Sequence, residues 1–101
     1  MPKLYDYFGI IVMFYANEHE PVHVHGKYQG CENRALIVLV DGEVQGIELT
    51  PVAGRPPLPP VQRRQFEELV QAKAQQIVSK WIDYFVLNKP IQPETLTRRL
   101  K

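Results

Sequence analysis

Apolar residues recur along the chain at two different periods, and the change of period separates a sheet-forming part from a helical part. Residues 8–15 form a continuous β-prone run with apolar side chains on both faces, which is typical of a central strand. Residues 35–40 form a second run of this kind. Asp41-Gly42 follows it, and this pair is a strong hairpin signal because both residues tolerate positive φ. A strand over residues 43–49 is therefore expected to pair back onto the preceding one.

The segment over residues 22–28 alternates strictly between two faces. His23 and His25 share one face with a lysine, while valine, glycine and tyrosine occupy the other. This alternation predicts a half-exposed strand with the two histidines on its polar face. The flanking segments contain the residues of turns and loops, so residues 16–21 are expected to form a loop and residues 29–33 a turn.

Between the last predicted strand and the helical part, residues 50–60 contain five of the nine prolines of the chain. Proline fits neither a sheet ladder nor a helix interior, so an extended crossover is expected here. Residues 61–87 carry an apolar stripe at three- and four-residue spacing, which predicts a long helix, either continuous or bent near Ser79. Pro60 suits its first position and Pro90 marks its end. The stripe comprises Phe66, Leu69, Val70, Ala74, Ile77, Trp81, Ile82 and Phe85.

Together these elements predict an α+β fold in a single domain over residues 1–101. We expect a four-stranded, mainly antiparallel sheet over residues 8–49, with the long C-terminal helix packed on one face. Residues 1–7 are expected to be a lead-in that packs on the sheet edge. The tail over residues 91–101 has acid at its start and base at its end, which predicts a short terminal helix.

The charges are unevenly distributed, although the formal net charge of the chain is only +1. Residues 1–50 carry a net charge of −4 and residues 51–101 a net charge of +5. A basic half is suited to phosphates or an acidic partner, and solvated helix ends are the alternative explanation. The candidate patch for nucleic acid or a partner comprises Arg63, Arg64, Arg98, Arg99 and Lys101.

The cysteine count and the hydropathy of the sequence indicate in which cellular compartment the protein is expected. Cys31 is the only cysteine and excludes an internal disulfide; it is expected to be an ordinary thiol. No charged start leads into an apolar run with a cleavage site, so we expect a cytoplasmic protein. The longest apolar run, residues 10–16, is far shorter than the roughly 20 residues that a membrane-spanning helix needs.

The histidines are the one group of residues in the sequence whose type and spacing suit the binding of a metal ion. His23 and His25 point to the same side of a predicted strand, and His19 in the preceding loop is placed to close a three-nitrogen site. Zinc binds such sets and keeps one position open, so a divalent ion such as zinc is the candidate cofactor, although no cofactor is certain from the sequence. Glu18 and Glu20 are candidates to orient the rings or to act as general bases. The alternative is that the three rings only form local hydrogen bonds.

These residues also carry a resemblance to a known family. The chain resembles the uncharacterised bacterial proteins grouped as domain of unknown function 4160, and its tail from Trp81 to Leu100 looks like a longer branch of that family. Val22 departs from the pattern, since many members have a proline there. The resemblance implies a compact α+β domain, often encoded beside a small partner and sometimes labelled a regulator or toxin–antitoxin component; it implies no catalytic residue. The matching positions are Gly9, Ile10, Tyr15, Glu18, His19, Pro21, His23 and His25.

Three functional hypotheses follow. The first is a small regulatory or interaction module, of toxin–antitoxin type, that binds a protein partner and perhaps nucleic acid. The second is a small metal- or histidine-dependent hydrolase or nuclease that uses His19, His23 and His25 with Glu18. The third is a structural homodimer module that associates through an exposed sheet face.

Overall fold

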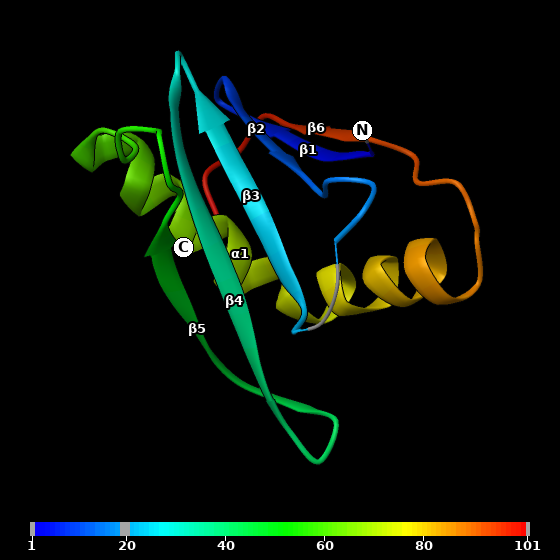
Figure 1. The fold of residues 1–101 in the computed structure, drawn as a ribbon. Helices are drawn as coiled ribbons and strands as arrows, with labels where there is room; N and C mark the ends of the chain where they lie inside the picture. Colours follow the sequence, from blue (N-terminus) through cyan, green and yellow to red (C-terminus); the bar gives the residue numbers. More distant parts are fainter. Residues whose placement is uncertain (1, 19–20, 101) are drawn as a thin grey trace.

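The computed structural model describes residues 2–18 and 21–100, which form one six-stranded sheet with a long helix across one face (Figure 1). The strand order is β5-β4-β3-β2-β1-β6. All neighbouring strands are antiparallel except β1 and β6, which are parallel. The elements are β1 (Lys3–Tyr7), β2 (Ile10–Met13), β3 (His23–Tyr28), β4 (Cys31–Val40), β5 (Glu43–Pro51), α1 (Pro60–Trp81), the π-helical segment η1 (Ile82–Val86) and β6 (Glu94–Leu96).

The α+β prediction is confirmed, but the predicted number of four strands is wrong because the sheet has six. One missed strand is β1, which occupies the predicted lead-in. Phe8 and Gly9 have φ values of 51° and 85° and form a two-residue turn, so the apolar run begins as a hairpin and not as a strand. Tyr7 therefore pairs with Ile10, and β2 is flanked on both sides as a central strand should be.

The second missed strand is β6, and the predicted short terminal helix is wrong. The tail is extended and pairs with the edge of β1 that would otherwise have unpaired backbone groups. Two further contacts hold it: the backbone N–H of Leu100 donates to the Tyr7 hydroxyl at 2.7 Å, and Arg99 forms a bidentate pair with Glu68 of α1. These tertiary contacts outweigh the local helical preference.

The predicted hairpin at Asp41-Gly42 is confirmed, with positive φ at both residues and Val40 opposite Glu43. The turn predicted over residues 29–33 is shorter than expected. Gln29 and Gly30 alone make it, so β4 already begins at Cys31 and places Glu32 within the sheet. The shorter turn places Glu32 opposite Lys27 of β3.

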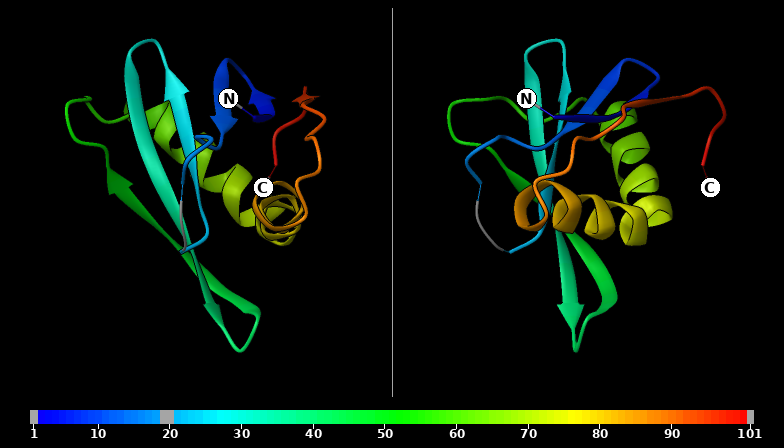
Figure 2. Two further views of the ribbon diagram at one scale, coloured as in Figure 1. Left: turned by 45° about the vertical axis from the view of Figure 1, so that its right-hand side comes forward. Right: turned by 90° about the vertical axis from the view of Figure 1, so that its right-hand side faces the viewer.

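The predicted helix is present and continuous, as α1 followed by η1 over residues 60–86. Its stripe is buried on β1, β3, β4 and β5, except that Ile82 is exposed and the stripe continues through Phe85. The helix approaches the sheet closely at Gly26 of β3, where an added Cβ would lie 2.7 Å from the Phe66 ring. Figure 1 shows α1 crossing behind the sheet, and Figure 2 shows the β4–β5 hairpin extending beyond the helix.

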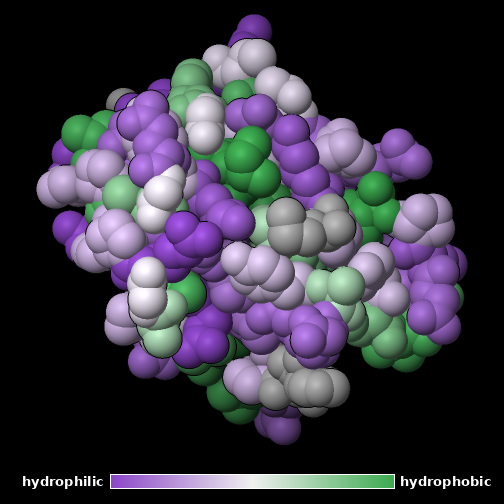
Figure 3. All heavy atoms as spheres, turned by 45° about the horizontal axis from the view of Figure 1, so that its top comes forward, coloured by the Kyte–Doolittle hydropathy of each residue, from purple (hydrophilic) through white to green (hydrophobic). Residues whose placement is uncertain are grey.

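Polar and apolar residues are mixed on the face of the molecule drawn in Figure 3, where the apolar ones form separate patches. The core lies between the sheet and α1 and includes the buried side chains of Tyr5, Phe14, Leu58 and Trp81. No helix in the described part of the chain combines the length and the apolar character needed to cross a membrane.

Candidate metal centre

The two histidines of β3 lie on one face of the strand. Val24 and Gly26 lie on the opposite face, which packs against α1. The two histidines are 6% and 5% exposed, so the predicted half-exposed strand is wrong at these positions. The loop that follows β2 covers them: the Tyr15 ring packs edge-on against His25 at 4.5 Å. Trp81, at the end of α1, lies 5.3 Å from the ring of His23.

The loop brings Glu18 between the two rings. Glu18 Oε2 lies 2.5 Å from His23 Nε2 and 2.9 Å from His25 Nε2. One ligand atom from each of the three residues lies within 4.8 Å of the other two, so these residues could together hold one metal ion. Glu18 therefore joins the predicted histidine pair directly, and not only as an assisting base. The other predicted members, His19 and Glu20, lie outside the described residues.

The Nδ1 atom of each imidazole also has an oxygen partner. His23 Nδ1 donates to the carbonyl oxygen of Pro21 at 2.7 Å, and His25 Nδ1 lies 3.0 Å from Glu32 Oε2. The same Glu32 oxygen accepts a hydrogen bond from the Tyr15 hydroxyl at 2.9 Å. Histidine ligands of metals usually have such partners, which fix the ring orientation and leave Nε2 free to coordinate.

All four ring nitrogens therefore face oxygen atoms that accept hydrogen bonds. A neutral imidazole has only one N–H, so one nitrogen of each ring would have its lone pair directed at an oxygen lone pair. Such contacts are stable only with a cation between the atoms, either an additional proton or a metal ion. A single divalent ion held by His23 Nε2, His25 Nε2 and Glu18 Oε2 would satisfy both rings at once.

The electrostatics favour an ionised Glu18. Burial acts to raise the pKa of its carboxyl group, but hydrogen bonds from the Tyr15 backbone N–H and from both imidazoles outweigh burial and lower the pKa from its ordinary value of 4.5. Burial and the hydrogen bond to Glu32 raise the pKa of the Tyr15 phenol, which stays a donor. The cluster therefore contains an anionic oxygen ligand beside two nitrogen ligands.

The cluster comprises Tyr15, Glu18, His23, His25 and Glu32, which are connected by hydrogen bonds. Tyr15 and Glu32 were not predicted as site residues. Glu32 lies seven residues after His25 and reaches it only because a two-residue turn folds β4 back beside β3. The signal was the Gln29-Gly30 pair, since a glycine in the second position suits a turn with positive φ at both residues. That turn fixes the register that brings Glu32 beside the histidine strand.

The described residues of the predicted basic patch lie on two parts of the chain, the start of α1 and the tail after β6. Arg99 is bound by Glu68 of α1, a residue one helical turn after Arg64. Arg63 lies in the first turn of α1 and Arg98 is exposed on the tail. Lys101 lies outside the described residues. Cys31 is a half-buried free thiol at the start of β4.

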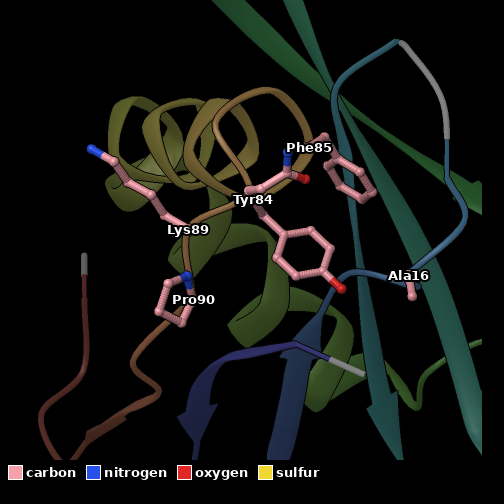
Figure 4. Close-up of a pocket in the computed structure, with 6 residues that line it drawn as sticks. Ala16, Tyr84, Phe85, Lys89 and Pro90 are labelled. Carbon is pink, nitrogen blue, oxygen red and sulfur yellow. The ribbon is translucent and has the colours of Figure 1, made fainter.

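A cavity of about 520 Å³ lies between η1 and the loop that carries Tyr15 and Glu18. Figure 4 shows the rings of Tyr84 and Phe85 directed toward Ala16 from the helix end, whereas the Lys89 side chain extends away from them. Phe85 packs on Trp81 at 4.3 Å, and Trp81 packs on a histidine of the cluster. One layer of aromatic rings thus separates this cavity from the candidate metal centre.

Comparison with known proteins gives one match. No curated protein and no solved structure is similar to the chain at a significant level. One family model matches residues 9–82, which span β2 to β5 and α1 and contain all five residues of the cluster; β1 and β6 lie outside the match. The resemblance noted from the sequence is thereby confirmed, and the chain belongs to the family described as Domain of unknown function (DUF4160).

Proposed function

We propose that this chain is a small metal-dependent hydrolase in which Glu18, His23 and His25 hold a divalent ion such as zinc. One observation carries the proposal: three ligand atoms converge within 4.8 Å while the far nitrogens of both imidazoles are anchored. Two histidine nitrogens and one carboxylate oxygen are a known ligand set of catalytic zinc, which keeps a further position for water or substrate.

The bound ion would supply a water molecule activated for attack on an ester or phosphodiester bond. The residues of the chain have separate roles. Glu32 and the Pro21 carbonyl orient the two rings, and the Tyr15 hydroxyl holds Glu32 in place. Nuclease activity is the first reaction to test, because the basic second half of the chain suits a polyanionic substrate.

Metal content tests the proposal directly. We expect the purified protein to contain about one transition-metal ion per chain by elemental analysis, and the metal-free protein to bind zinc in calorimetry. Glu18→Gln should weaken zinc binding at least roughly tenfold, since it removes a charged ligand. Glu68→Gln is the matched control, because this carboxylate lies on α1 outside the cluster.

A protein that contains no stoichiometric metal, and whose zinc affinity is the same in Glu18→Gln and Glu68→Gln, would contradict the metal centre. For the reaction itself, hydrolysis of bis-p-nitrophenyl phosphate and of single-stranded RNA should require added metal. Activity that persists in the metal-free protein would rule out metal-dependent chemistry.

A regulatory or interaction module, as in toxin–antitoxin pairs, is a second candidate that one observation favours. β5 is an edge strand, and the β4–β5 hairpin extends beyond the helix with Val38 and Val40 exposed, the latter by 53% (Figure 2). An open edge with exposed valines is suited to strand addition by a protein partner or by a second copy. Gel filtration of wild-type protein and Val40→Lys tests it: a monomer in both cases argues against self-association.

A further inference from the structure

A second cavity, of about 240 Å³, lies beside the metal centre and shares Glu32 with it. Its walls come from β2, β3, the start of β4 and the turns next to them, together with Arg55 of the crossover. A water molecule takes up about 30 Å³ in the liquid, so the cavity has room for a small polyatomic ligand. All of its lining residues lie within the segment matched by the family.

Two cations line this cavity. Lys27 lies opposite Glu32 in the β3–β4 pair, so both side chains project from the same face of the sheet. Its ammonium group lies 5.7 Å from the centre of the Tyr15 ring, and it forms no ion pair with any carboxylate of residues 2–18 and 21–100. Arg55 places Nε 4.0 Å from Glu32 Oε1 and is half exposed. Two positive charges against one negative charge favour an anionic ligand.

The third group is the Glu32 carboxylate, which is only 2% exposed. Its Oε2 atom accepts hydrogen bonds from the Tyr15 hydroxyl and the His25 ring. Its Oε1 atom accepts none from the part of the chain described, because Arg55 Nε at 4.0 Å is too distant. A ligand that fills the cavity shields Oε1 from water, so a ligand that donates a hydrogen bond to this oxygen is preferred.

We propose that this cavity binds a small oxyanion that still carries a proton, of which monohydrogen phosphate is the simplest. Its unprotonated oxygens accept hydrogen bonds from Lys27 and Arg55, and its P–OH group donates to Glu32 Oε1. Sulfate has a similar shape and charge but no proton at neutral pH, so one of its oxygens would face Oε1 without a hydrogen bond. The site needs no metal and therefore goes beyond the proposed hydrolase.

Calorimetry of the full chain, dialysed free of metal, at about pH 8 separates the ligands. Inorganic phosphate keeps one proton at this pH, whereas methyl phosphate is a dianion without one because the second pKa of a phosphate monoester is about 6. We expect phosphate to bind at least roughly tenfold more tightly than sulfate or methyl phosphate, since both would shield Glu32 Oε1 from water without donating a hydrogen bond to it. Equal affinities, or no binding of phosphate, would overturn the proposal.

Variants locate the site. Arg55→Gln, in the exposed crossover, and Lys27→Gln should each weaken phosphate binding at least roughly tenfold by removing a charged donor. Arg64→Gln is the matched control, because this exposed arginine of α1 lies outside the cavity. Phosphate binding that is unchanged in both cavity variants would overturn the assignment. Because the titration uses metal-free protein, its failure and a failure of zinc binding are separate results.

Discussion

The two faces of β3 are buried to a similar extent but are stabilised in different ways. On the helix side, Val24 is fully buried and Gly26 lets the Phe66 ring approach the strand. On the other side, His23 and His25 are also buried, and each ring nitrogen has an oxygen partner. The apolar face depends on close packing, whereas the polar face depends on hydrogen bonds between the two imidazoles and their oxygen partners.

The largest expected effect is on the apolar face. Gly26→Val should destabilise the protein by about 3 kcal/mol, because its Cβ would overlap the Phe66 ring and force the helix away from the sheet. Urea denaturation measures this loss. Gly46→Ala in β5 is the matched control, since nothing lies within 4 Å of an added Cβ there, and it should cost far less. Equal losses in the two variants would contradict close packing at Gly26.

A pair of truncations compares the faces directly. Val24→Ala and His25→Ala should each cost about 2 kcal/mol, the first through a cavity and the second through carboxylate oxygens left without donors. Only His25→Ala should also weaken zinc binding. Urea denaturation and zinc calorimetry of both variants test this, and an equal loss of zinc affinity in Val24→Ala would show that the two faces are not independent.

A half-buried tyrosine, Tyr15, and a buried one, Tyr5, extend the comparison to effects of about 1 kcal/mol. The Tyr15 hydroxyl donates to Glu32, so Tyr15→Phe should destabilise the protein by about that amount. The Tyr5 hydroxyl has no hydrogen-bond partner in the described part of the chain, and burial, with Glu94 nearby, raises its pKa to about 12. Tyr5→Phe should therefore be neutral or stabilising. Denaturation midpoints that move in the same direction for both variants would contradict this assignment.

The smallest effect concerns pH. The folded state lowers the pKa of Glu18 from 4.5, so the unfolded chain takes up a proton first as the pH falls. The stabilisation is therefore complete above the ordinary value and is lost as the pH falls through the folded-state pKa. In metal-free protein, the stability difference between wild type and Glu18→Gln should narrow from about pH 6 to about pH 3. A stability difference between wild type and Glu18→Gln that stays constant over this pH range would contradict the prediction.

Local signals in the sequence predicted the centre of the molecule well. Period-two alternation placed His23 and His25 on one face, and Asp41-Gly42 fixed a hairpin. The Phe8-Gly9 turn was missed because phenylalanine rarely adopts positive φ, so the residue was assigned to the strand. The carboxylate of Glu32 was missed because its contact with a histidine depends on the length of a turn.

The outer strands and the burial of the site depend on contacts that local patterns do not contain. β6 has three residues, and Glu94 and Thr95 are exposed, so only the neighbouring edge of β1 makes it a strand. The histidine face looked solvent-exposed because alternation reports which side chains share a face, but not whether a loop covers that face. The loop of Tyr15 and Glu18 provides this cover.

The parallel pairing of β1 with β6 has a consequence for the order of assembly. The hydrogen bond from Leu100 to Tyr7 joins residues 93 positions apart, whereas two-residue turns connect β1 to β2, β3 to β4 and β4 to β5. Closing so long a loop is slow compared with forming local hairpins. We therefore expect β6 to join the sheet last during folding and to open first in the native state, while the residues around the candidate metal centre stay protected.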